Sequence, residues 1–254
     1  MKIKSLIIGM TLALTLVGCT TEMRLANRFV TDAHQVRAAV YFPEEARVTL
    51  MQDEQGNYTK VLDSLDQNAF LDIMYASCAD RLRSYDVDVY VPENSDDIQV
   101  DSIHWLVLLT QMEIQGKITS YTDCFYDFVD TYEFQVPLNT VNVAAWFDIN
   151  DGEWRPTLFY EHNLIEDYHS GVVRKEGEYH YDYSVVEMKT DDLYNYAVYL
   201  GRTYADCLFN DMMNKYVRSE MTKQNAVPRF RMRWDPQEKT FYLADEEEGF
   251  IELD

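Results

Sequence analysis

The chain has 254 residues, 47% of them hydrophobic, and a formal net charge of −22 at pH 7. This composition can build a substantial core, and the length suits one large domain or two small ones. The excess of 44 acidic over 22 basic residues excludes nucleic-acid binding by charge attraction. The same excess opposes attraction of the chain as a whole to anionic lipid headgroups.

The first residues have the organisation of an export signal. Lys2 and Lys4 precede an apolar stretch from Leu6 to Val17, which is too short to span a bilayer as a stable helix. The stretch ends in Leu16-Val17-Gly18-Cys19, which is a branched apolar residue, a permissive position, a small residue and a cysteine. This ending resembles the lipobox of bacterial lipoproteins. An ordinary signal peptide or a buried cysteine is the alternative interpretation.

The lipobox resemblance implies that residues 1–18 are a signal peptide and that Cys19 is acylated on its sulfur and on the new amino terminus. We then expect residues 19–35 to be a lipidated tether and residues 36–254 to be a single domain. Several acyl chains would anchor the protein firmly, because each buried methylene contributes about 0.8 kcal/mol. By the same resemblance, Thr20 favours the outer membrane, with the periplasmic face expected and surface exposure as the alternative.

The first part of the expected domain combines short strands with one amphipathic helix. Strands are expected over residues 36–42 and 46–51. Ser64 and Gln67 have the spacing of a capping box, which predicts a helix from about 64 to 85. The apolar face of this helix recurs at spacings of three and four residues and comprises Phe70, Ile73, Met74, Ser77, Cys78 and Leu82.

The middle of the chain has the pattern of consecutive β-strands. Period-two alternation over 86–91 predicts one strand, and the apolar run over 103–114 predicts a strand near the sheet centre. A longer strand is expected over 132–149, with its partner over 154–160. Asn150-Asp151-Gly152 lies between these two strands and tolerates the positive φ of a hairpin turn.

The last part contains the strongest helical pattern. Residues 161–187 are polar and aromatic without a clear period, so we expect an irregular segment there. A helix is then predicted from about 190 to 220, because Thr190 supplies a hydroxyl cap and two carboxylates follow at the positive end of the helix dipole. A C-terminal hairpin over about 229–244 and an acidic tail from Asp245 to Glu248 complete the chain.

These elements predict an α+β fold with a mostly antiparallel sheet of about four to six strands and both main helices on one face. The element order over roughly residues 36–220 resembles outer-membrane accessory lipoproteins of lipopolysaccharide assembly or ABC-type lipid transport. The resemblance implies a non-enzymatic accessory subunit with an envelope protein as its partner. It assigns no role to any single residue, because it rests on element order and lipidation alone.

An aromatic segment offers one candidate binding surface. Tyr121, Phe125, Tyr126, Phe128 and Tyr132 lie close together in the sequence, and stacked rings bind sugars or hydrophobic ligands. A glycan- or lipid-binding lipoprotein is therefore the alternative to an accessory subunit. The same rings are equally suited to packing beneath a long loop.

An arginine-rich strand offers a second candidate. Arg229, Arg231 and Arg233 share one face of a predicted strand in an otherwise acidic chain. That face suits an acidic partner or headgroup. The chain's own tail, Glu246 to Glu248, is an equally good counterpart.

No catalytic or metal-binding pattern stands out. GxSxG, HExxH and P-loop motifs are missing from the sequence, and pairs of acids are expected by chance among 44 of them. We therefore predict no metal, no cofactor and no enzymatic activity, with an unrecognised hydrolase as the alternative. One segment holds imidazoles and carboxylates, but its spacing fits no metal-ligand set, so we expect a solvated loop. Its members are Glu161, His162, Glu166, Asp167, His169 and His180.

Three cysteines follow Cys19. Cys78 and Cys207 fall in apolar helical patterns, where a free thiol packs as a small hydrophobic group. We expect these thiols to be buried. One disulfide among Cys78, Cys124 and Cys207 is the alternative in an oxidising periplasm.

Overall fold

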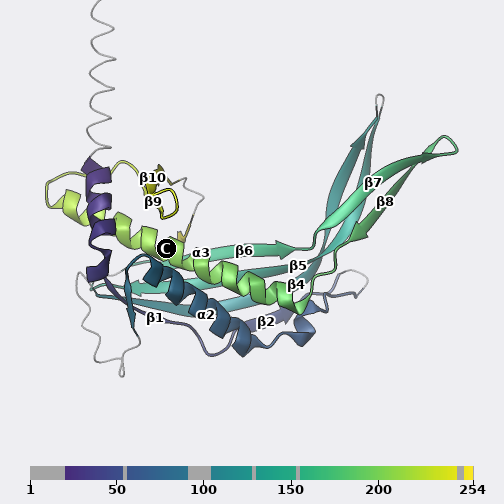
Figure 1. Ribbon diagram of the computed structural model, residues 1–254. Coiled ribbons are helices and arrows are strands. Elements are labelled where there is room, and N and C mark those ends of the chain that lie inside the picture. Colours follow the sequence, from purple (N-terminus) through teal and green to yellow (C-terminus); the bar gives the residue numbers. More distant parts are fainter. Residues whose placement is uncertain are drawn as a thin grey trace, which may run out of the picture.

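The structure is a computed structural model of the chain (Figure 1), and it describes residues 21–53, 56–90, 104–127, 130–152, 155–244 and 249–253. The expected signal peptide over 1–18, Cys19, Phe128 and the acidic tail over 245–248 lie outside the described residues. Those expectations therefore stay predictions.

The described residues form strands and helices throughout. The strands are β1 (Arg37–Tyr41), β2 (Arg47–Leu50), β3 (Asp88–Tyr90), β4 (His104–Tyr126), β5 (Thr131–Asn150), β6 (Thr157–Ile165), β7 (Tyr168–Lys175), β8 (Glu178–Val185), β9 (Met232–Asp235), β10 (Thr240–Leu243) and β11 (Ile251–Leu253). The main helices are α2 (Gln67–Ser84) and α3 (Thr190–Thr222), and short 3₁₀ helices cover Ala33–Gln35 and Val61–Ser64.

The α+β fold is confirmed. A seven-stranded sheet has the order β11-β6-β5-β4-β1-β3, with β2 also paired to β4, and β7–β8 and β9–β10 are separate hairpins. Most pairing is antiparallel, above all between β4 and β5. Strand β1 is parallel to both β3 and β4, because the chain crosses over through α2 between β1 and β3. The C-terminal hairpin appears as β9–β10, within the predicted residues 229–244.

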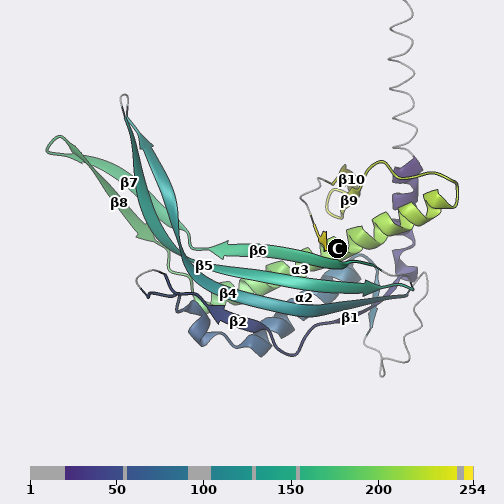
Figure 2. The same cartoon turned by 180° about the vertical axis from the view of Figure 1, so that it is seen from behind.

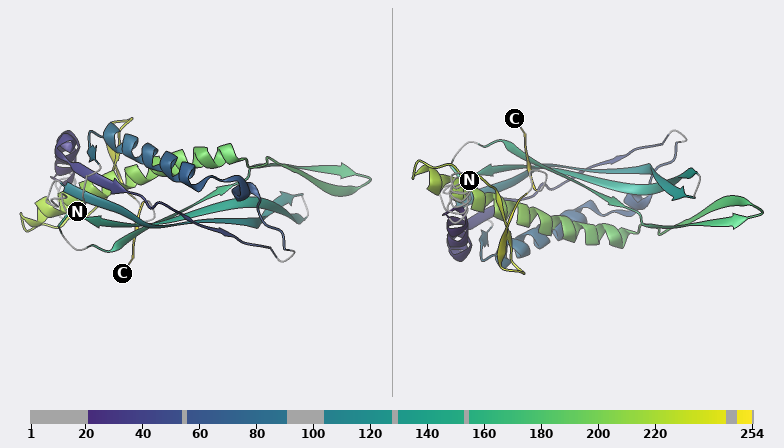
Figure 3. Two further views of the ribbon diagram at one scale, coloured as in Figure 1. Left: turned by 90° about the horizontal axis from the view of Figure 1, so that it is seen from below. Right: turned by 90° about the horizontal axis from the view of Figure 1, so that it is seen from above.

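Helices α2 and α3 form where the apolar spacing predicts them and lie side by side on one face of the sheet (Figures 1 and 3). Their buried faces and the facing side of the sheet form one hydrophobic core. The cap of α3 is Lys189, whose backbone N–H donates a hydrogen bond to the carboxylate of Asp192. The predicted cap, Thr190, is instead the first residue of the helix.

The start of α2 also differs from the prediction. Asp66, not Ser64, caps the helix, and its carboxylate accepts hydrogen bonds from the backbone N–H groups of Asn68 and Ala69. Ser64 ends a 3₁₀ helix, and its hydroxyl lies 2.7 Å from Thr190 Oγ1 at the start of α3. The predicted capping box does not form, because the hydroxyl of Ser64 contacts the start of α3 and does not cap α2.

The expected tether over residues 19–35 is corrected by the structure. Residues 21–31 are helical, and Leu25, Ala26 and Phe29 are buried in the core. The ring of Phe29 lies 5.6 Å from that of Phe209 in α3. These three apolar residues have the i, i+1 and i+4 spacing that gives a short helix one packed face. The folded domain therefore includes residues 21–31.

Strands β4 and β5 extend far beyond the other strands of the sheet (Figures 1 and 2). Strand β2 pairs with β4 up to Gly116, and β6 pairs with β5 from Thr140 onward. Beyond these points, residues 118–126 and 131–139 pair only with each other in the described sheet, over nine residue pairs or about 30 Å. The β7–β8 hairpin runs beside this extension. We call residues 118–126, residues 131–139, β7 and β8 together the arm.

The arm corrects two expectations. The strand predicted over 103–114 continues to Tyr126, so the aromatic segment is β-strand and not a connection. The segment 161–187, expected to be irregular, contains the end of β6 and the whole β7–β8 hairpin. Glu176 and Gly177 both have positive φ and form its two-residue turn.

Candidate functional site

The inner face of the arm is an aromatic layer between its two hairpins. The ring of Phe134 in β5 stacks on Tyr181 in β8, with 4.1 Å between ring centroids. Phe125 and Tyr132 both contact Tyr179, at centroid distances of 5.1 and 5.4 Å. Two of the predicted binding residues, Phe125 and Tyr132, therefore join one hairpin to the other.

A partly exposed polar contact adds to this layer. Asp123 in β4 accepts hydrogen bonds from the hydroxyls of Tyr181, at 2.7 Å, and Ser170, at 2.8 Å. These two donors, and the backbone N–H of Cys124, hold the pKa of the Asp123 carboxyl below its ordinary value. The charged carboxylate thus ties β4 to both strands of the other hairpin.

The arm also carries exposed apolar side chains. Tyr126, at the end of β4, is 72% exposed. Val173 and Tyr183 are also exposed, on β7 and β8. Tyr121, another predicted binding residue, is half-buried. Among the predicted aromatic residues that the structure describes, Tyr126 is the most exposed.

A cavity of about 480 Å³ lies at the base of the arm, between the end of β6, the segment after β8 and the start of α3. His162 stands beside two tyrosines: its Nδ1 lies 3.1 Å from Tyr196 Oη and its Nε2 lies 3.4 Å from Tyr199 Oη. The Tyr196 hydroxyl donates to the His162 carbonyl, so Nδ1 must be the donor to that hydroxyl. The other lining residues are Leu164, Ile165, Glu166, Asp167, Val186, Glu187, Met188, Asp192 and Asn195.

The chemistry of this cavity suits a small molecule with apolar faces and hydroxyl groups. Burial lowers the pKa of His162, so the imidazole is neutral and its Nε2 is an acceptor. Tyr199 presents a partly exposed ring beside it. Apolar walls with a few oriented polar groups are typical of ligand sites. Local spacing places Tyr196 on the apolar face of a helix but does not indicate its contact with His162, because the two residues meet only through the tertiary fold.

The polar segment considered for metal binding is dispersed. The carboxylate of buried Glu166 accepts hydrogen bonds from the Asn139 backbone and side-chain amides and from the Met188 backbone, so it fastens β5 to the start of α3. His169 and His180 are exposed on β7 and β8. In the described part of the chain, no three metal-ligating side chains come together.

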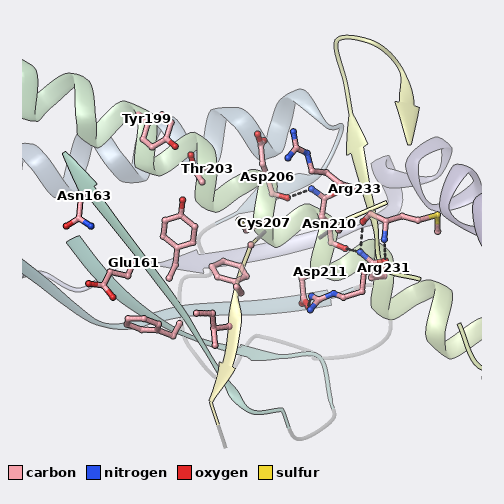
Figure 4. Close-up of a pocket in the computed structure, with 18 residues that line it drawn as sticks. Glu161, Asn163, Tyr199, Thr203, Asp206, Cys207, Asn210, Asp211, Arg231 and Arg233 are labelled. Carbon is pink, nitrogen blue, oxygen red and sulfur yellow. Dashed lines mark hydrogen bonds and ion pairs between the residues drawn. The ribbon is translucent and has the colours of Figure 1, made fainter. Parts of the chain in front are cut away.

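A larger cleft of about 800 Å³ is lined by α3, β6, the start of the C-terminal hairpin and residues 249–251 (Figure 4). Arg231 and Arg233 line it, and Arg231 Nη2 lies 4.0 Å from Asp211 Oδ1 of α3. Arg229 does not line it; its backbone N–H donates to buried Glu22. The predicted arginine face is therefore split, and at least Arg231 meets an acid of the folded body. The alternative counterpart, the acidic tail, lies outside the described residues.

Polar side chains in this cleft are largely committed to the fold. Asn214 accepts a hydrogen bond from the backbone N–H of Met232 and donates one to its carbonyl. Asn210 accepts from the backbone N–H of Trp234. These contacts hold the hairpin on α3, so the cleft has fewer groups available to a ligand than its volume suggests.

A buried ion network lies close to this cleft and shares Asp211 with it. Arg155 donates to Asp211 at 2.6 Å and to Asp151 at 3.1 Å, and Lys215 also pairs with Asp151. The Arg155 guanidinium lies 4.7 Å from the Trp105 ring centroid. Two cations thus oppose two carboxylates beneath an aromatic ring, so the buried charges of the network are paired.

The three described cysteines are free. Cys78 is buried, Cys207 is partly buried and Cys124 is exposed on β4. The structure thus leaves no disulfide among them, and it buries Cys78 fully and Cys207 in part. Among the described helices, none is both long and apolar enough to cross a membrane.

The chain matches no protein-family model, no curated protein and no solved structure in comparisons with known proteins. Its function is therefore argued from its own sequence and geometry.

Proposed function

We propose that this chain is a lipid-anchored accessory subunit of an outer-membrane assembly or transport complex, without enzymatic activity of its own, and that it binds an envelope protein through its arm. The observation that carries the proposal is the arm itself. A globular domain has no need of a two-layered extension of about 30 Å for its own stability.

The placement of the arm supports this role. The helix over 21–31 and the arm lie at opposite ends of an elongated molecule (Figures 1 and 3). Thr21 follows the proposed lipidation site, Cys19, by two residues. A lipid at one end and a projecting arm at the other allow the protein to bridge between its anchor and a partner.

The construction of the arm also favours partner binding. The stacked pair of Phe134 and Tyr181 and the hydrogen bonds to Asp123 stiffen it, so little conformational entropy is lost on binding. Tyr126 and Tyr183 remain exposed, and tyrosine is among the residues that dominate binding energy in protein interfaces.

Site-specific cross-linking in intact membranes tests the proposal. A photoreactive phenylalanine analogue at Tyr126 should capture one defined protein, whereas the same analogue at Ile251, exposed in β11, should not. The double variant Tyr126→Asp, Tyr183→Asp should lower co-purification of that protein about tenfold or more. Cys19→Ala should abolish co-purification if the lipid positions the subunit. A solubilised protein that is always alone would contradict the proposal.

A second candidate function, glycan or lipid binding, is favoured by the cavity at the base of the arm. The surface that the sequence suggests for this function, residues 121–132, is less suitable, because Phe125 and Tyr132 pack against Tyr179. In the cavity, Tyr199 and neutral His162 offer a ring face and an acceptor instead.

Thermal stabilisation by a panel of mono- and disaccharides and of short-chain lipids tests this candidate. Tyr199→Ala should abolish any stabilisation, and Tyr183→Ala, an exposed tyrosine on the arm, should leave it unchanged. If Tyr199→Ala binds as the parent does, the cavity is not the ligand site.

A further inference from the structure

An exposed apolar patch surrounds the start of the helix over 21–31. Met23, Phe230, Tyr242 and Leu243 are 41%, 40%, 48% and 60% exposed, respectively. They line a common hollow of about 70 Å³ together with Glu22, Met232 and Phe241. Large exposed apolar side chains are ordinary when scattered, but a gathered group marks a contact surface. We call Met23, Phe230, Tyr242 and Leu243 the hairpin patch.

Two arginines border the hairpin patch. Arg24 follows Met23, Arg229 precedes Phe230, and both are exposed. Glu22, the acid next to Met23, is buried, and its carboxylate accepts the backbone N–H of Arg229. The acidic residues 245–248, which follow Leu243 closely in the chain, lie outside the described residues. In a chain of net charge −22, this is a place where apolar side chains adjoin cations. That combination complements the phosphates and acyl chains of a lipid surface.

The described part of the chain begins beside this patch. Thr21 is the first described residue, and Met23 lies in the first turn of the helix that follows it. Two residues span about 7 Å at most, so an acyl group on Cys19 would enter the bilayer close to Thr21. A rigid, packed helix in place of a tether leaves the body little freedom to move away from the membrane.

We propose that the hairpin patch rests on the membrane surface, with Met23, Phe230, Tyr242 and Leu243 at the acyl boundary and Arg24 and Arg229 among the phosphates. This proposal extends the proposed lipid anchor from a point attachment to a defined docking face. It fixes which end of the elongated molecule meets the bilayer and leaves the arm tip at the other end.

Fluorescence quenching by brominated lipids tests the proposal. An environment-sensitive probe is attached at Leu243→Cys in a Cys124→Ser background, because Cys124 is the exposed cysteine among those described. The full chain is mixed with vesicles of phosphatidylethanolamine and phosphatidylglycerol. The probe at 243 should shift to the blue and be quenched, whereas the matched probe at Tyr183→Cys on the arm should not.

The outcomes separate the patch from the anchor. The probe reports lipid contact whether acyl chains or the patch alone hold the protein, so a missing acyl group does not conceal the result. A protein that floats with vesicles while its 243 probe stays unquenched overturns the docking face but leaves the lipid anchor intact. A protein that neither floats nor shows quenching overturns both. Cross-linking from Tyr126 is read separately and reports on the arm alone.

Substitutions within the patch give an independent measurement. Arg24→Gln with Arg229→Gln should remove the preference of the 243 probe for phosphatidylglycerol over neutral phosphatidylcholine vesicles. Arg202→Gln, an exposed arginine of α3, is the matched control and should keep that preference. Equal quenching in both lipids for the parent protein would contradict the assigned role of the two arginines. Quenching of the Tyr183 probe instead would assign the membrane contact to the arm.

Discussion

Gly201 of α3 touches the backbone of α2 directly: a Cβ at Gly201 would lie 2.2 Å from the carbonyl oxygen of Met74. It would also lie 3.0 Å from the backbone nitrogen of Cys78. Backbone atoms cannot rotate away as a side chain can. The two main helices are therefore held at a separation that only glycine permits at this position.

Gly201→Ala should lower the free energy of unfolding by about 2 kcal/mol, because overpacking forces the helices apart and outweighs the better helix propensity of alanine. Urea denaturation measures the change. Gly171→Ala is the matched control, since a Cβ at Gly171 in β7 meets no atom within 4 Å. Equal stability of the two variants would show that the helices adjust at no cost.

Arg155→Leu should lower the free energy of unfolding by about 3 kcal/mol, because it leaves the buried carboxylates of Asp151 and Asp211 short of a cation. The double variant Arg155→Leu, Asp211→Leu should recover part of this loss by removing one of those charges. Denaturant midpoints of the parent and both variants check this. A double variant less stable than Arg155→Leu would mean that the packing of these side chains, and not the balance of their charges, determines the effect of the network on stability.

The arm should loosen in acid through Asp123. The hydroxyls of Tyr181 and Ser170 lower the pKa of this carboxyl, and an unfolded aspartate titrates near about pH 4. The contact is therefore fully present above about pH 4 and is lost as pH falls through the lower folded pKa. NMR resonances of the Tyr181 ring should shift below that pH. Asp123→Asn should remove this pH dependence, and an unchanged profile would assign it to another group.

Thiol reactivity should separate the three described cysteines. Cys124 should react quickly with a disulfide reagent in the folded protein, because it is exposed. Burial raises the pKa of Cys207 to about 12 and also raises the pKa of Cys78. Partly buried Cys207 should therefore react more slowly than Cys124, and fully buried Cys78 should react only on unfolding. Mass spectrometry of labelled peptides checks this. Rapid labelling of Cys78 would mean that α2 and α3 separate readily.

The two main helices were predictable because their burial follows from local spacing. The N-cap of α2 was not predictable in this way, because Ser64 and Asp66 are both good N-cap residues. Asp66 is the cap in the folded protein, where Ser64 contacts Thr190 instead. The β7–β8 hairpin had a usable signal in Glu176-Gly177, a two-residue turn followed by tyrosines at every second position. The tether prediction missed the apolar spacing that begins at Leu25.

The candidate sites were less accessible from sequence. The sequence leaves open whether the rings of Phe125 and Tyr132 bind a ligand or pack. Only the position of Tyr179, about fifty residues later in the chain, shows that they pack. The meeting of His162 with Tyr199 likewise depends on how β6 lies against α3. Local periodicity identifies a face but not what covers it.

The hydrogen bond from the backbone N–H of Arg229 to Glu22 joins residues 207 positions apart. A chain still emerging from a ribosome or a translocon cannot make this contact until almost all of it has passed through. Because β1 also cannot pair until β3 and β4 have been made, the N-terminal part has few stable partners early in synthesis. The topology thus delays folding until the chain is nearly complete, which suits the export across a membrane that the proposed function requires.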